Sequence, residues 1–254
     1  MHSEEELKQF RARQVEVLYD QSIPAVTAAL TAAVVVVAIL WNKVEATRLW
    51  IWLLIYLVVT GIRYFGVYRY KESEYKADRF EFWLNSYCLW AIVSGVMWGV
   101  TGYAFELGED VIYLSFLLLC VCGLIAGSIP SYAVIHRAYY SFTLPASIML
   151  IFYIATVPDS RLHTVAFLAC FYVGFMIYIE FRTHGIIKRL IELQLDNRSL
   201  LLYLDDEKQQ SEVIQRRWQQ DTIKYSEIVD KLYFARQRIN ELEQQLNEYK
   251  KIQE

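Results

Sequence analysis

The sequence predicts an all-α protein, in which a six-helix transmembrane bundle is followed by a long cytoplasmic parallel coiled coil. Hydrophobic residues make up 56% of the 254 residues, whereas a soluble domain has about 45–50%. The excess lies before Phe181, and the rest of the chain carries a heptad repeat from Ile186 to Tyr249. These patterns predict an N-terminal amphipathic helix (1–21), a membrane bundle (22–182) and a coiled coil (183–254).

Six apolar stretches are long enough to cross a bilayer, since about 20 residues of helix span a hydrocarbon core of about 30 Å. Pro130 is expected to end the fourth stretch, and Pro145 is expected to kink the fifth. The predicted spans are Ser22–Trp41, Leu49–Tyr68, Phe82–Phe105, Val111–Ile129, Ala138–Val157 and Leu162–Phe181.

The Lys and Arg residues outside the spans predict the orientation. Up to Arg189, segments on one side of the six spans hold eleven of them, and those on the other side hold three. Because short cytoplasmic loops are enriched in positive charge, both termini are expected to be cytoplasmic. An apolar stripe of Phe10, Val17 and Leu18 predicts that the N-terminal helix either lies on the inner leaflet or packs under the bundle.

A 3.5-residue repeat sustained over this length specifies a left-handed supercoil with a partner helix. Leu at the d positions favours a parallel homodimer, with a trimer or tetramer as the alternative. The polar residues Asn197, Glu207, Ser211 and Asp221 interrupt the repeat, and they predict either a segment that switches between two packings or one that splays and hydrates. The predicted dimer seam comprises Leu190, Asn197, Leu204, Trp218, Tyr225, Leu232, Ile239 and Leu246.

Charged residues inside membrane spans are costly and are usually paired. Arg63 lies within the second span and Glu180 at the inner end of the sixth. We therefore expect an ion pair of Arg63 with Glu180, or with Asp20 beside the first span. The alternative is that Arg63 extends to the inner headgroups.

Small residues four apart predict close helix crossings. Gly95 and Gly99 form such a pair in the third span, and Gly123 and Gly127 form one in the fourth. Tight packing is one interpretation. The other is a pocket for a small hydrophobic or amphipathic signal, with Thr60, Trp90, Ser94, Trp98 and Tyr103 as its candidate ligand-binding residues.

No catalytic motif is visible, so the chain is not expected to be an enzyme. The four cysteines lie in apolar runs without metal or disulfide spacing, and no two histidines are four residues apart on one helix. No cofactor and no metal site are therefore expected, and a bis-histidine haem is disfavoured. With a net charge of −3, nucleic acid is an unsuitable partner.

Several motifs together resemble a known family. They are Arg13–Tyr19, Trp52 with Arg63 and Tyr70, Ser94–Gly99, and Gly123–Ser128 with Pro145. From Arg11 to about Glu207, the chain resembles the six-span N-terminal sensory domain of bacterial diguanylate cyclases, c-di-GMP phosphodiesterases and sensor histidine kinases. The resemblance implies a bacterial inner-membrane location and an output domain after a coiled coil.

No GGDEF, EAL, PAS or kinase sequence follows the heptads, so the family's enzymatic activity does not carry over. Either an output domain has been removed, or the protein acts on a separate cytoplasmic output protein. We expect a sensory module that dimerises, contacts membrane lipids and relays a helix rearrangement inward. The alternatives are an oligomeric ion channel or carrier assembled by its coiled coil, and a membrane-anchored scaffold.

Overall fold

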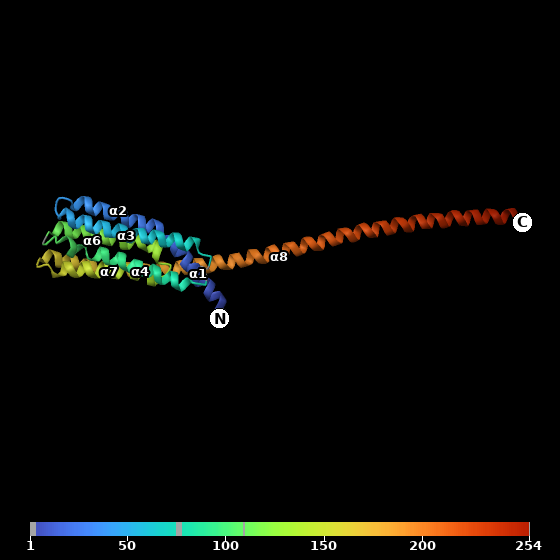
Figure 1. The fold of residues 1–254 in the computed structure, drawn as a ribbon. Coiled ribbons are helices and arrows are strands. Elements are labelled where there is room, and N and C mark those ends of the chain that lie inside the picture. The colour runs from blue at the N-terminus through green and yellow to red at the C-terminus, as the bar shows by residue number, and fades with distance from the viewer. Residues whose placement is uncertain (1–3, 75–77, 109, 254) are drawn as a thin grey trace. The chain divides into compact units, whose positions relative to one another are not determined.

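The prediction of an all-α fold is confirmed. The computed structural model describes residues 4–74, 78–108 and 110–253, and these residues form eight helices and no strand (Figure 1). The chain divides into two compact units, residues 1–193 and residues 194–254. Each unit is described by itself below.

Six helical segments are long and apolar enough to cross a membrane. Two of them each join two consecutive helices, α1 with α2 and α4 with α5. Each of the six segments coincides with one of the six predicted spans, and the sixth is the first part of α8. The helices are α1 (Glu4–Asp20), α2 (Ser22–Leu40), α3 (Ala46–Glu72), α4 (Phe80–Gly99), α5 (Thr101–Phe105), α6 (Val111–Tyr132), α7 (His136–Thr156) and α8 (Ser160–Gln253).

Helices α4 and α7 make an extensive contact in the N-terminal unit. Gly95 and Gly99 make this contact possible, because a Cβ atom on either residue would collide with the backbone of α7. A Cβ on Gly99 would lie 2.5 Å from the carbonyl oxygen of Pro145. The small-residue pair of the third span therefore lies at a close helix crossing.

Helix α1 packs against the bundle, which is one of the two places predicted for it. Val15, Leu18 and Tyr19 are buried, and α1 contacts α2, α3 and α4. The hydroxyl of Tyr19 donates a hydrogen bond of 2.9 Å to the carbonyl oxygen of Trp83, and the Tyr19 ring stacks on Tyr70 at 4.1 Å between centroids. Residues 1–3 of the predicted helix lie outside the described residues.

The connection between α6 and α7 is shorter than predicted. Pro130 does not end α6, which continues to Tyr132. The hydrogen bonds lost around a proline involve its own nitrogen and the preceding turn, so two more residues can still adopt helical geometry. Residues 133–135 then lead directly into α7 at His136.

The second unit consists of the later part of α8. Its described apolar seam residues are all exposed in the single chain, with Leu204 at 56%, Trp218 at 72% and Leu232 at 65%. The side chain of Leu246 lies outside the described residues. These exposed residues form one apolar stripe along the helix.

Candidate functional site

The central feature of the bundle is a buried arginine. Arg63 lies in α3 and is 8% exposed. Its Nη2 donates a hydrogen bond of 2.6 Å to the hydroxyl of Tyr132 on α6, and its guanidinium lies 5.8 Å from the ring centroid of Tyr87 on α4. An aromatic face and a neutral hydroxyl both favour a cation, but neither neutralises its charge.

The structure does not form the predicted ion pair. Glu180 is fully buried, and its Oε1 lies 2.8 Å from Nδ1 of His136. Asp20 is paired instead with Lys71 at 3.9 Å. Depth in the membrane was the only basis for joining Arg63 to Glu180, and two residues at one depth can face different neighbours around the helix axis. Burial also argues against the alternative, in which Arg63 reaches the headgroups.

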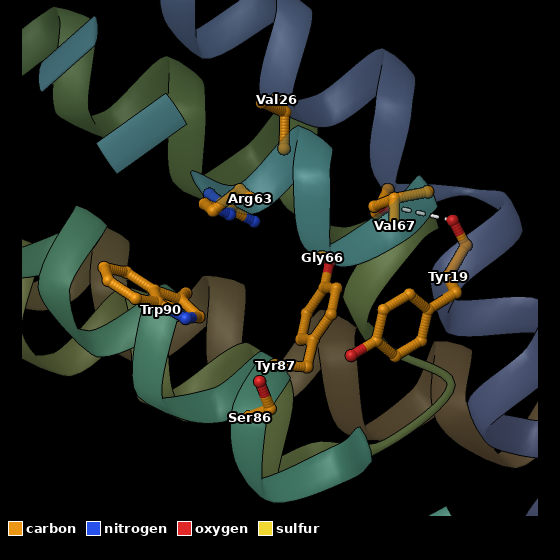
Figure 2. A pocket seen from close by; sticks show the side chains of 9 residues that line it. Tyr19, Val26, Arg63, Gly66, Val67, Ser86, Tyr87 and Trp90 are labelled. Atoms are coloured by element: carbon orange, nitrogen blue, oxygen red, sulfur yellow. Dashed lines mark hydrogen bonds between the residues drawn. The ribbon is translucent and has the colours of Figure 1, made fainter. Parts of the chain in front are cut away.

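Two small cavities meet at Arg63. The first has a volume of about 20 Å³ and is lined by residues of α1, α2, α3 and α4. Figure 2 shows Arg63 on α3 above Tyr87 and Trp90 on α4, with Tyr19 and Val67 to one side. The hydroxyl of Tyr87 is buried and has no hydrogen-bond partner within the described part of the chain. This cavity has room for about one water molecule.

The second cavity has a volume of about 80 Å³ and lies between α2, α6 and α7. Gly123 and Gly127 line it together with Arg63 and Tyr132. A Cβ atom on either glycine would meet no atom within 4 Å. The small-residue pair of the fourth span therefore borders a cavity, in contrast to the pair of the third span, which lies against the backbone of α7.

The five predicted ligand-binding residues do not line one pocket. Thr60, Ser94 and Trp98 are buried in the core, where the indole N–H of Trp98 donates a hydrogen bond of 3.1 Å to the hydroxyl of Tyr56. Tyr103 is 44% exposed and packs on Tyr153. Trp90 alone among the five lines a cavity that adjoins Arg63.

The structure also brings together three residues that sequence reasoning did not connect. His136 at the start of α7 lies beside Glu180 and His184 of α8, and one potential ligand atom from each lies within 4.8 Å of the others. No two of these residues are histidines four apart on one helix, so the histidine spacing alone does not reveal the cluster. The available signal was Glu180 with His184, because residues four apart share a helix face.

Arg63 and its surroundings can bind an anion. A guanidinium offers five N–H donors in a planar fork that matches carboxylate and phosphate oxygens, and the unpartnered Tyr87 hydroxyl adds another donor. The chain is thus an all-α protein with six helices able to span a membrane and a buried cationic site between them. No protein-family model, curated protein or solved structure matches this chain.

Proposed function

We propose that this protein is a membrane-embedded sensory module that dimerises through α8 and passes a change in helix packing to a cytoplasmic output. One observation carries the proposal. The single helix α8 contributes buried residues to the bundle, including Leu162, Ala166 and Glu180, and also carries the exposed heptad seam. A displacement of α8 within the bundle would therefore alter its pairing in the coiled coil.

Exposure of the seam supports self-association. Burying a side chain of the size of Leu contributes about 1.5–3 kcal/mol, and Leu190, Leu200 and Leu204 each leave more than half of their surface exposed in the single chain. A second α8 in parallel register would cover them. Leu201 and Tyr203, which flank the seam, are also exposed. Apolar flanks favour a coiled coil of more than two helices, so the number of protomers must also be measured.

Cysteine crosslinking tests the seam. The four native cysteines, Cys88, Cys120, Cys122 and Cys170, are free thiols and would first be replaced by serine or alanine. Leu204→Cys places a thiol in the predicted seam, and Leu202→Cys is the matched control on the opposite face of the helix. In membranes, oxidation should crosslink the first variant and leave the second largely monomeric. Equal yields would contradict the seam, and light scattering of the purified protein counts the protomers.

The input that we propose is a small anionic amphiphile bound at Arg63. Among the described residues, no carboxylate pairs with the buried charge, which supports an anionic group, and the apolar lining by Val26, Val67 and Trp90 supports a hydrocarbon portion. Pockets for whole small-molecule ligands usually measure about 300–1,000 Å³. The cavity of about 80 Å³ therefore admits a head group. The cavity of about 20 Å³ holds about one water molecule, and a longer ligand requires α2 to move away from α3 or α6.

Thermal unfolding in detergent tests the input. A medium-chain fatty acid should raise the unfolding temperature of the wild-type protein, and the corresponding fatty alcohol, which lacks the charge, should not. Arg63→Gln should abolish the difference between the two compounds. If the difference persists in this variant, the anion binds elsewhere. Ion flux through the protein in liposomes would instead identify the channel that the sequence left as an alternative.

A further inference from the structure

A second polar cluster lies away from Arg63, where α7 begins beside α8. His136 is the first residue of α7, and Glu180 and His184 are one turn apart on α8. The Nδ1 atom of His136 lies 2.8 Å from Oε1 of Glu180, and the two imidazole rings lie 3.8 Å apart between centroids. Two nitrogen donors and one carboxylate thus converge from two helices.

Glu180 is the unusual member, because its side chain is fully buried. A buried carboxylate requires a compensating charge or several hydrogen bonds. The hydroxyl of Tyr140 donates a long hydrogen bond of 3.3 Å to Oε2, and His136 supplies the contact to Oε1. A divalent cation between the three groups would compensate the charge of the buried carboxylate.

His184 is held in a form suited to a metal ion. Nδ1 of His184 lies 2.7 Å from the carbonyl oxygen of Ala133. A carbonyl oxygen only accepts hydrogen bonds, so Nδ1 carries the proton and Nε2 has a free lone pair. Metal-binding histidines typically donate their second nitrogen in this way to a carbonyl or carboxylate, which fixes both tautomer and ring orientation.

We propose that His136, Glu180 and His184 form a binding site for a divalent transition-metal ion, with Zn²⁺ as the best match. Two imidazoles and a carboxylate are a donor set that suits Zn²⁺ and other late first-row ions and does not suit Ca²⁺ or Mg²⁺, which prefer oxygen. The side chain of His136 is 33% exposed, so an ion can enter from solvent, and water can occupy a fourth position.

The observed separations lie on both sides of those expected for this assignment. With bonds of about 2.0–2.2 Å to nitrogen and oxygen, the donor atoms of a tetrahedral Zn²⁺ site lie roughly 3.3 Å apart. The closest pair is at 2.8 Å, and all three lie within 4.8 Å. His136 can transfer its ring proton to Nε2, after which Nδ1 and the carboxylate both face the ion. We expect rotation of the side chains to bring the three donor atoms to these separations.

Binding of zinc chloride to the purified full-length chain tests the proposal. After treatment with a chelator and its removal, calorimetry should give about one Zn²⁺ per chain, and binding should weaken by at least tenfold in His184→Ala and in Glu180→Gln. His163→Ala is the matched control, because His163 is an exposed histidine on the same helix, and its affinity should be unchanged. Equal affinity in all four proteins would overturn the site.

Cobalt(II) supplies a readout that does not depend on the variants. Bound to the wild-type protein, it should develop the intense visible absorption of tetrahedral nitrogen and oxygen ligation, and Zn²⁺ should remove that absorption by competition. A weak spectrum of the octahedral type, or no binding above that of detergent alone, would overturn the proposal even if a variant failed to fold. Circular dichroism shows which variants retain their helices. Neither measurement involves Arg63 or the pairing of α8, so the sensory proposal is tested separately.

Discussion

The contrast between the two glycine pairs gives the sharpest test of the packing. In Gly95→Ala, the new Cβ would lie 2.8 Å from Cγ of Pro145 and closer still to the carbonyl oxygen of Phe142. In Gly123→Ala, the new Cβ would meet nothing within 4 Å. Both changes are made inside a helix, so the gain in helix propensity of about 1 kcal/mol is common to both.

The difference between these variants isolates the cost of the collision. Ordinary contacts begin near 3.4 Å, so α4 and α7 must separate by at least 0.6 Å at Pro145, and backbone cannot rotate away as a side chain can. Overpacking of this kind costs about 1–3 kcal/mol. At about 2–4 °C per kcal/mol for a domain of 150–250 residues, Gly95→Ala should unfold roughly 2–12 °C below Gly123→Ala.

Thermal unfolding in a single detergent, followed by loss of helical circular dichroism, measures this gap. Gly123→Ala should unfold at or slightly above the wild-type temperature. Equal unfolding temperatures for the two variants would refute the assignment of the α4–α7 crossing as the closest packing in the bundle. A lower temperature for Gly123→Ala than for Gly95→Ala would place the close crossing at α6 instead.

Three further outcomes follow from the same structure. Tyr132→Phe removes the hydrogen-bond acceptor of the buried Arg63 and should cost about 1.5–3 kcal/mol, measured by chemical unfolding in mixed micelles. Trp98→Ala empties a fully buried site and should cost about 3–5 kcal/mol, with a matching loss in unfolding temperature. The Arg48 guanidinium, 2.7 Å from Glu106, lowers the pKa of that carboxyl. The pair therefore stabilises the fold above the ordinary pKa of a glutamate, and this contribution is lost as the pH falls through the lowered pKa. Arg48→Ala should reduce the acid dependence of the unfolding temperature.

Each of these outcomes has a contrary result. A Tyr132→Phe variant as stable as wild type would mean that Arg63 has another acceptor of equal strength. A small effect of Trp98→Ala would mean that neighbouring aromatic side chains collapse into the space. An unchanged acid profile in Arg48→Ala would show that the pair with Glu106 is fully screened by solvent.

The secondary structure was predictable because it depends on patterns along one chain. Apolar stretches of sufficient length identified all six candidate spans, and the apolar stripe of Val17 and Leu18 anticipated a helix before the first. The helices of the structure differ from the predicted spans only in where they begin and end, as at α6, which continues beyond Pro130. The pairing of α8 with a second copy stays a prediction, since it depends on a partner.

The site was less predictable, because its contacts join helices that are distant in the sequence. Depth in the membrane placed Arg63 and Glu180 at similar levels but did not give the direction in which either side chain points. Tyr132 and His136, the partners that they actually have, come from α6 and α7. Likewise, Gly95 and Gly123 carry the same motif, and only the position of a neighbouring backbone separates a crossing from a cavity.

The position of Arg63 between two cavities has a consequence for any molecules that enter them. Both spaces adjoin one guanidinium, so an anion bound in the second would screen its charge and weaken binding of any polar molecule in the first. By thermodynamic reciprocity, a molecule bound in the first would weaken binding in the second to the same extent. The arrangement makes occupancy of the two spaces antagonistic through one shared side chain.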